Sequence, residues 1–376
     1  MLCMAVTATA AHARQPDDFG EGVAKDDPAL LDAELMPRAA QSLLLDIVDG
    51  GGLFVAVGER GHVLHSSDGI EWTQAEHVPT RSTLTAVAHV DGRYWAVGHD
   101  GVILHAPSGP SHWERQRAEP LVIGGFDPEA GVPLLDVLFL DTGRGFAIGA
   151  FSLLLETTDG GASWTSRFLS EEAEDIGGDI AAGAPVDEED PGSDEDDFIV
   201  DDDDDWNFSA DDLMLDAEDD PHLNAIVRTG SGALMIAAER GTMFRSRDEG
   251  QSWERFRLPY EGSMFGVLSW EDDHVMVLGL RGNVFESFDL GDSWQRVDTG
   301  TEASLMGGLA LPGGGALLVG NEGRMLWRPS GDQPFTALTY TNEEGETPVL
   351  AAPAARDDGS FILVGERGVD RTRRLD

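Results

Sequence analysis

Cysteine, lysine and long hydrophobic runs are almost missing from this chain. Cys3 is the one cysteine in 376 residues, and Lys25 is the one lysine among 25 basic residues. A disulfide framework is therefore excluded, and so is a cysteine metal site. No run reaches the roughly eighteen apolar residues of a membrane-spanning helix, so we expect a protein that does not itself span a membrane.

Positive charge is scarce as well. The chain has 70 acidic residues and a formal net charge of −45. Nucleic acid is excluded as a partner, because phosphate binding requires a basic footprint. Residues 171–220 hold 24 of the acidic residues and no lysine or arginine. This composition is typical of a disordered segment, and a solvated surface loop is the plainest interpretation. The segment lacks the D-x-D-x-D-G pattern of a calcium loop, and we assign no metal and no cofactor.

The N-terminus has the pattern of an export signal. A short apolar run ends in Ala11-His12-Ala13, directly before polar residues. Small residues at this spacing are typical of a signal-peptidase site. We expect residues 1–13 to be a signal peptide cleaved near Ala13, residues 14–33 to be an N-terminal extension, and the mature protein to be periplasmic. Cys3 would leave with the signal peptide.

Glycine is abundant, at 46 residues, and it marks a repeat. Seven tight turns align, and their third positions are separated by 40, 51, 89, 41, 41 and 45 residues. The long interval contains the acidic segment 171–220. A period of about 40 residues with about four short strands is typical of a β-propeller. The aligned turns are Glu59-Arg60-Gly61, His99-Asp100-Gly101, Ala150-Phe151-Ser152, Glu239-Arg240-Gly241, Leu280-Arg281-Gly282, Asn321-Glu322-Gly323 and Glu366-Arg367-Gly368.

The repeat predicts an all-β, seven-bladed propeller of four-stranded antiparallel blades over residues 34–376. The acidic insertion then lies between blades three and four. Each unit opens with an apolar strand that should line the central channel, and a second, almost wholly apolar strand should be buried on both faces. The last unit ends without a fourth strand, so we expect residues 34–38 to supply it and to close the ring. The predicted channel strands are Leu43–Val48, Leu84–Val90, Leu134–Leu140, Leu223–Val227, Met264–Trp270, Leu305–Leu311 and Val349–Ala355.

A second pattern, Ser/Thr-x-Asp-(x)-Gly-x-Ser-Trp, recurs between the third and fourth strands. The aspartate can accept hydrogen bonds from amides of its own turn, and glycine permits a positive φ. The tryptophan can be buried between blades. We interpret this motif, the Asp box, as structural and not catalytic. Its residues are Asp68, Trp72, Asp159, Trp164, Asp248, Trp253, Asp289 and Trp294.

The opposite face receives the middle residue of each aligned turn. Four of these seven residues are arginine: Arg60, Arg240, Arg281 and Arg367. In so acidic a protein they would form a local basic arc, and we predict that they bind a partner. The alternative is a turn sequence that duplication has copied without a function. The acidic insertion leaves from the same face, so we also consider that it screens this arc.

The repeat region resembles the photosystem II stability/assembly factor-like family of β-propellers, which have Asp-box, or BNR, repeats. The resemblance is carried by Val-Gly-Glu-Arg-Gly at 57–61 and 364–368, by Ala96-Val-Gly-His-Asp-Gly101 and by the Asp boxes. For photosynthetic members it implies a scaffold that binds an assembling membrane protein through an arginine-rich face. Exported bacterial relatives resemble accessory proteins of resistance-nodulation-division (RND) exporters. We therefore expect a non-enzymatic accessory protein, monomeric when free, that binds a membrane protein or transporter complex.

An enzyme is the main alternative. A sialidase-like glycosidase needs an arginine cluster, a nucleophile and an acid/base pair. The chain has three tyrosines, and no serine-histidine-aspartate order, histidine pair or phosphate loop stands out among its residues. A propeller that binds a small molecule or lipid at the channel mouth is the other alternative. We assign no catalytic residue.

Overall fold

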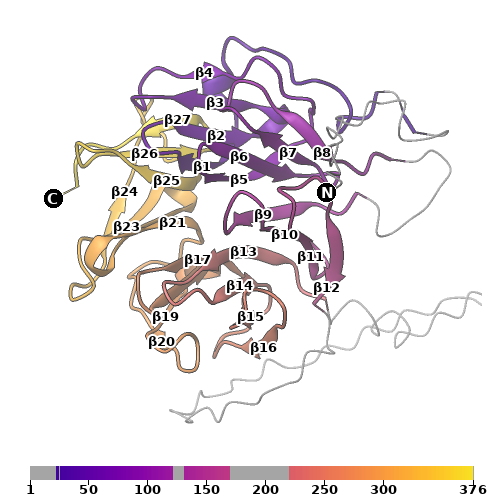
Figure 1. Ribbon diagram of the computed structural model, residues 1–376. Helices are drawn as coiled ribbons and strands as arrows, with labels where there is room; N and C mark the ends of the chain where they lie inside the picture. Colours follow the sequence, from indigo (N-terminus) through magenta and orange to yellow (C-terminus); the bar gives the residue numbers. More distant parts are fainter. Residues whose placement is uncertain (1–22, 25, 122–130, 170–219, 376) are drawn as a thin grey trace, which may run out of the picture.

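The computed structural model describes residues 23, 24, 26–121, 131–169 and 220–375. Seven antiparallel sheets surround a central axis, and each follows the order of the chain from the inside to the outside (Figure 1). Six sheets have four strands and one has three. The prediction of an all-β, seven-bladed propeller is confirmed. The predicted signal peptide and almost all of the acidic insertion lie outside the described residues.

The innermost strands form a closed ring, because each contacts the inner strand of the next blade and the last contacts the first. In every blade the pairing of this strand with its neighbour shifts after its first residue, as in a β-bulge. The second residue is therefore left out of the regular register. The inner strands are β1 (Leu44–Asp49), β5 (Leu84–Val90), β9 (Leu134–Phe139), β13 (Leu223–Arg228), β17 (Met264–Ser269), β21 (Leu305–Leu311) and β25 (Leu350–Ala355).

The second strand of each blade is buried over almost its whole length, as its continuous apolar sequence predicted. Its side chains meet those of the neighbouring blades, and seven hydrophobic clusters, mostly between adjacent blades, make up the core. The second strands are β2 (Phe54–Gly58), β6 (Arg93–Gly98), β10 (Gly145–Gly149), β14 (Leu234–Ala238), β18 (Val275–Gly279), β22 (Gly315–Gly320) and β26 (Phe361–Gly365).

The third and fourth strands complete the blades towards the rim. The third strands are β3 (Val63–Ser66), β7 (Ile103–Ala106), β11 (Leu153–Thr157), β15 (Thr242–Ser246), β19 (Val284–Ser287), β23 (Arg324–Arg328) and β27 (Gly368–Arg371). The outer strands are β4 (Thr73–Gln74), β8 (Glu114–Arg117), β12 (Thr165–Phe168), β16 (Glu254–Arg257), β20 (Gln295–Arg296) and β24 (Thr336–Thr339). Since consecutive strands alternate in direction, turns between second and third strands lie on the face opposite the Asp boxes.

The seventh blade corrects one prediction. Its sheet has three strands, β25 to β27, and residues 34–38 form no strand beside it. Pro37 has no amide hydrogen to donate to a sheet. The amide of Met36 and the carbonyl of Glu34 instead hydrogen-bond the side chain of Gln74 in blade one, both at 2.8 Å.

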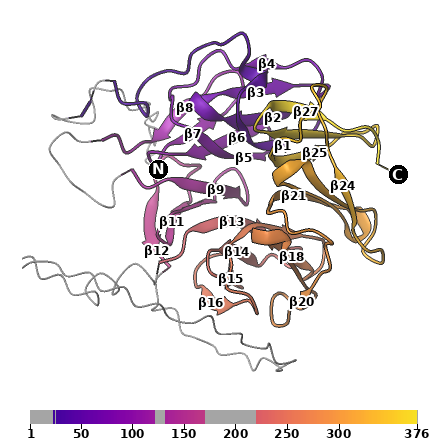
Figure 2. The ribbon, with the colours of Figure 1, turned by 180° about the vertical axis from the view of Figure 1, so that it is seen from behind.

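The ring is nevertheless closed at this point. The short 3₁₀ turn η2 (Ala39–Gln41) contacts β27, and one hydrophobic cluster joins side chains of blades one and seven. Both views of the ribbon place β25 to β27 beside β1 to β3 (Figures 1 and 2). Side-chain packing and a 3₁₀ turn therefore close the ring at the place where a fourth strand was expected to close it.

No helix among the described residues is long and apolar enough to cross a membrane. Part of the predicted N-terminal extension packs on the propeller: Ala29 is fully buried, and its carbonyl accepts a hydrogen bond from Arg115 of blade two at 2.9 Å. The Asp27 carboxylate accepts the amide of Leu121 at 2.8 Å. This extension is thus held by blade two as well as by blade one.

Candidate functional site

The seven aligned turns surround the start of the inner strands, because one backbone contact repeats in every blade. The first residue of each turn donates its amide to the carbonyl of the residue directly before the inner strand of the same blade. In blade one this bond joins Glu59 to Leu43 at 3.0 Å, and in blade five it joins Leu280 to Ser263 at 3.0 Å. Gly58 precedes the turn, and a Cβ there would overlap the Leu43 carbonyl. Glycine at this position in six of the seven blades therefore permits close backbone approach, and blade four has Ala238 there.

We call the middle residues of these turns the tip residues. Six of the seven have a left-handed backbone, with φ between 54° and 58°. Residues other than glycine rarely adopt this conformation, so the surrounding turn must impose it. It points the side chain away from the sheet, and every tip residue except the half-buried Asp100 is exposed. The tip residues, in blade order, are Arg60, Asp100, Phe151, Arg240, Arg281, Glu322 and Arg367.

The four predicted arginines all lie at exposed tips on this face. They form two pairs on adjacent blades, Arg60 with Arg367 and Arg240 with Arg281. Arg367 makes an ion pair with Glu346 at 3.0 Å, in which both side chains are about half exposed. Such an exposed pair contributes little to stability, on the order of 0–1 kcal/mol. The guanidinium of Arg367 is therefore available for exchange with another carboxylate.

Glutamates precede three of these arginines, and in the structure their carboxylates accept backbone hydrogen bonds. Glu59, Glu239 and Glu366 each accept the amide of the residue just before an inner strand, at 3.2–3.3 Å. These carboxylates join the turn to the inner strand of the same blade. They still reduce the positive potential at the tips, but the fold accounts for their presence.

The Asp boxes have the hydrogen bonds that the sequence predicted. The hydroxyl of Thr157 accepts the amide of Gly161 at 2.8 Å, and Asp159 accepts both the amide and the hydroxyl of Ser163. The equivalent bonds occur at 246–252 and 287–293. Hydrogen bonds from Ser252 hold the pKa of Asp248 at about 2. These contacts support the interpretation of the motif as structural.

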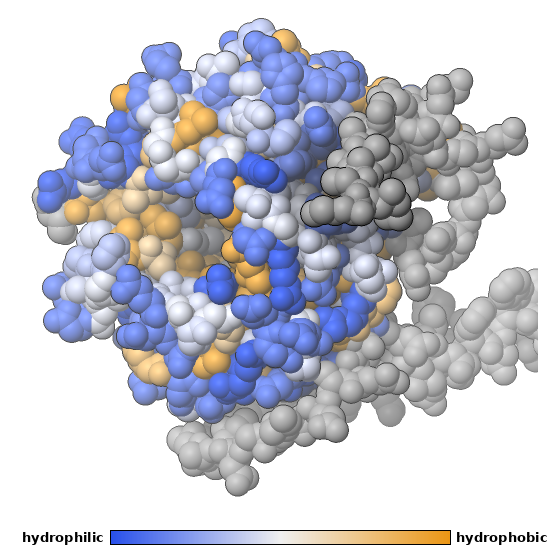
Figure 3. Space-filling model, viewed as in Figure 1, coloured by the Kyte–Doolittle hydropathy of each residue, from blue (hydrophilic) through white to orange (hydrophobic). Residues whose placement is uncertain are grey.

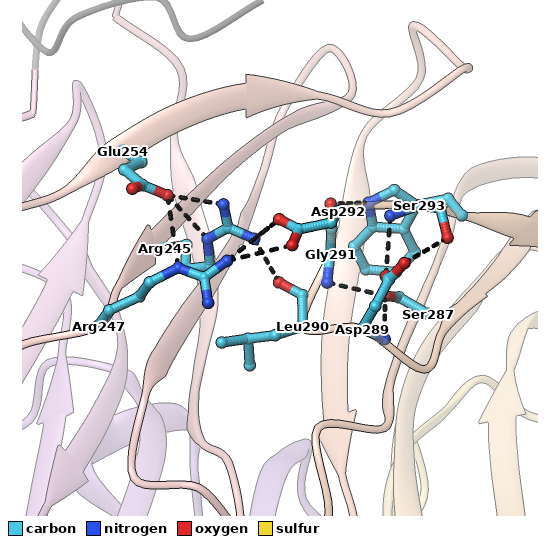
Figure 4. A network of polar contacts seen from close by, with 10 residues as sticks. Arg245, Arg247, Glu254, Ser287, Asp289, Leu290, Gly291, Asp292 and Ser293 are labelled. Atoms are coloured by element: carbon cyan, nitrogen blue, oxygen red, sulfur yellow. Dashed lines mark hydrogen bonds and ion pairs between the residues drawn. The ribbon is translucent and has the colours of Figure 1, made fainter. Parts of the chain in front are cut away.

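Arginines on the Asp-box face connect neighbouring blades. Arg245 of blade four donates to the carbonyl of Leu290 at 2.7 Å and pairs with Asp292 of blade five and Glu254 (Figure 4). Blade three reaches blade four in the same way, since Arg167 donates to the Gly250 carbonyl at 2.7 Å. No sequence pattern predicted these contacts, because the arginines occupy different positions in their repeats.

Two buried carboxylates in the channel strands were also missed. Burial raises the pKa of Asp46 to about 6 and that of Asp136 to about 7. Asp46 accepts the amides of Ile47 and of Val87 in the next blade, both at 2.8 Å. Asp136 does the same two blades further on, where it joins β9 to β13 through the amide of Ile226 at 2.8 Å. The available signal was an aspartate within an apolar strand, in Leu-Leu-Asp-Ile and Leu-Leu-Asp-Val.

Those hydrogen bonds bear on catalysis. Each of the four carboxylate oxygens accepts a backbone amide. A general acid or nucleophile must present an oxygen to its substrate, whereas these oxygens connect inner strands of different blades. The arrangement fits a structural role for both residues.

A cavity of about 880 Å³ lies away from the tips, between the N-terminal segment at Leu30–Asp32 and the loop 107–115 of blade two. None of the predicted site residues lines it. Among the described residues, no three histidine, cysteine, aspartate or glutamate side chains are grouped to hold a metal ion. The tip residues therefore remain the candidate site.

No family model matches the chain. A photosystem II assembly lipoprotein, Ycf48 of Prochlorococcus marinus, is 34% identical over 120 residues, which are 32% of this chain and 35% of the relative. A solved structure described as YCF48 bound to D1 peptide has a TM-score of 0.59 at 15% identity, and covers 93% of this chain and 100% of its own.

The fold alone is shared more widely. A streptogramin B lyase has a TM-score of 0.56 at 12% identity, and covers 90% of this chain and 95% of its own. Propeller geometry at such low identity therefore does not separate a binding protein from an enzyme. Similarity in sequence as well as in fold links this chain to Ycf48, over 32% of this chain and 35% of that relative.

Proposed function

We propose that this protein is a non-enzymatic scaffold that binds a membrane protein through the tip residues Arg60, Arg240, Arg281 and Arg367. The observation that carries the proposal is their placement: four exposed guanidinium groups on one face of a strongly acidic protein. Guanidinium groups bind carboxylates with two parallel hydrogen bonds, so an acidic segment is the expected ligand.

The contrast between the two faces supports this proposal. On the Asp-box face, Arg245 and Arg167 donate to carbonyls of a neighbouring blade and so hold the ring together. Among the described residues, the side chains of Arg60, Arg281 and Arg367 donate to no backbone carbonyl of a neighbouring blade. A YCF48 solved with a D1 peptide shows that a propeller of this family can hold a peptide ligand.

The partner and the compartment are further parts of the proposal. We propose that the protein is exported to the periplasm and is an accessory protein of an RND-family exporter, as the resemblance to exported bacterial relatives implies. Cell fractionation and N-terminal sequencing test the first part. A mature chain that starts directly after Ala13 supports export, and an intact N-terminus on cytoplasmic protein contradicts it.

Affinity purification from the native membrane tests the second part. The tagged full chain should recover a membrane protein, and the change of all four tip arginines to glutamate should abolish that recovery. Arg93→Glu with Arg296→Glu is the matched control, because these arginines are exposed but are not tip residues. Equal recovery by the tip variant and the control would refute the role of the tips. Recovery of a membrane protein that is not an RND exporter would refute only the identity of the partner.

A further inference from the structure

Apolar side chains line the mouth of the channel next to the tips. The second position of each inner strand, where the bulge lies, holds Leu45, Leu135, Phe265 and Met306 in four blades. We call these the mouth residues. None of them belongs to the hydrophobic clusters between the blades, and all are partly exposed, Met306 to 36%. They therefore lie outside the apolar clusters that form the core of the described structure.

Polar residues at this position show where its side chains point. Thr85 donates its hydroxyl to the carbonyl of Leu134 at 2.7 Å, and Asn224 donates its amide to the carbonyl of Met264 at 2.9 Å. In both cases the acceptor is the first residue of the next inner strand. Phe265 and Met306 occupy the same position, so they cover the start of the next inner strand at the rim of the channel.

The tip arginines lie beside these same strand starts. The amide of Arg281 donates to the hydroxyl of Ser304 at 3.2 Å, two residues before Met306. Gly241, which follows Arg240, donates to the carbonyl of Gly262 at 2.9 Å, three residues before Phe265. Two neighbouring blades thus each place the backbone of an arginine turn beside the segment that leads to an apolar mouth residue.

The same arrangement occurs where the ring closes. Gly368, which follows Arg367, lies so close to the Ala40 carbonyl and to Gln41 that a Cβ would overlap them. Leu45 follows four residues later. Figure 3 shows patches of hydrophobic residues among hydrophilic ones near the middle of the face in view. Where the ring closes, the turn that carries Arg367 thus lies against the segment that leads into the strand of Leu45.

We propose that the mouth residues select the partner: the ligand is an acidic peptide segment that also carries large apolar side chains, which enter the channel mouth while its carboxylates bind the tip arginines. This proposal rests on the proposed function and adds to it. A purely acidic segment would leave the mouth residues in water. An apolar residue between two carboxylates would cover them and exclude water from the neighbouring ion pairs, which strengthens those pairs.

Two synthetic peptides test this selection with the full chain. One is a twelve-residue peptide that alternates aspartate with leucine, and the other alternates aspartate with serine; both carry a fluorophore for anisotropy. The unchanged protein should bind the leucine peptide about ten-fold more tightly, a difference of about 1.4 kcal/mol. Phe265→Ser with Met306→Ser should remove that preference and leave the affinity for the serine peptide unchanged. Ile70→Ser is the matched control, because Ile70 is 48% exposed on the Asp-box face.

The outcomes separate the two proposals. If changing the tip arginines to glutamate weakens both peptides but the mouth variant keeps the preference for leucine, selection by the mouth is wrong and binding by the tips stands. If the tip variant binds both peptides as well as the unchanged protein, the proposed function itself fails. If only a chain without residues 171–219 binds, the acidic segment competes for the site, and selection of a partner by the full chain is refuted. Circular dichroism of each variant confirms that the ring is folded.

Discussion

The carboxyl group of Asp136 should make the stability of the propeller decrease as the pH rises towards neutrality. Burial raises its pKa from 3.8 to about 7, while hydrogen bonds from the amides of Ile226 and Val137 act in the opposite direction. In the unfolded chain this group is ionised above pH 3.8. A group whose pKa is raised by folding stabilises the protein fully below the unfolded pKa, and this contribution is lost as the pH rises through the folded pKa.

The size of the effect follows from the shift of the pKa. A shift of about 3 units corresponds to about 4 kcal/mol at about 1.36 kcal/mol per unit. Between pH 5 and 7 the unfolded group stays ionised while the folded group loses its proton, so this one residue should reduce the free energy of unfolding by about 2 kcal/mol. The channel side of Asp136 retains some contact with solvent, which makes these values upper bounds.

Urea unfolding of the unchanged protein and of Asp136→Asn, at a series of pH values from 5 to 8, measures this contribution. The asparagine cannot accept both amides and will cost a constant amount, on the order of 1–3 kcal/mol. That cost is the same at every pH, so the informative quantity is the difference between the two pH profiles. The profile of the variant should be flatter by about 2 kcal/mol over this range. Parallel profiles would show that the carboxyl group is ionised throughout and that the reasoning is wrong.

Three further predictions concern the fold and the class of the protein. Gly58→Ala should destabilise the protein by about 2 kcal/mol or more, because the added Cβ overlaps the Leu43 carbonyl. Gly331→Ala is the control, because its Cβ would meet no atom closer than 3.4 Å and its φ is not in the left-handed region; similar melting temperatures for both would contradict the argument from close approach. Arg245→Gln should lower the urea midpoint by the equivalent of about 1–3 kcal/mol, since it breaks the contact between blades four and five. Arg247 is more exposed, so Arg247→Gln should change the urea midpoint little. A larger effect of Arg247→Gln than of Arg245→Gln would be incompatible with the contacts described. A panel of fluorogenic glycosides should show no turnover by the purified protein, and turnover that disappears on changing a channel aspartate would replace the scaffold by an enzyme.

The blades and their inner strands were predictable because the signals for them are local. A run such as Ala316–Val319 between glycines can only be a buried strand, and a glycine precedes six of the seven aligned turns. These signals recur at a constant period, so they also fix the number of blades. The tip arginines were predictable for the same reason, since the turn determines their exposure.

The remaining features depend on contacts between distant segments. Residues 34–38 have the length and position of a strand, but the side chain of Gln74, which no pattern links to them, satisfies their backbone groups instead. The burial of Asp136 likewise requires the amide of Ile226, 90 residues away. Neither partner can be identified from one sequence, because the pairing exists only once the ring is closed.

The tip residues show how such a protein can change its partner. Backbone hydrogen bonds hold each tip, and glycines flank most of the turns, so the fold does not depend on the identity of the tip side chain. The same turn already presents arginine, aspartate, phenylalanine and glutamate around one ring. These seven positions can therefore differ in charge and aromatic character while the fold stays the same. A new binding specificity can arise through single substitutions at the tips, and each intermediate remains folded.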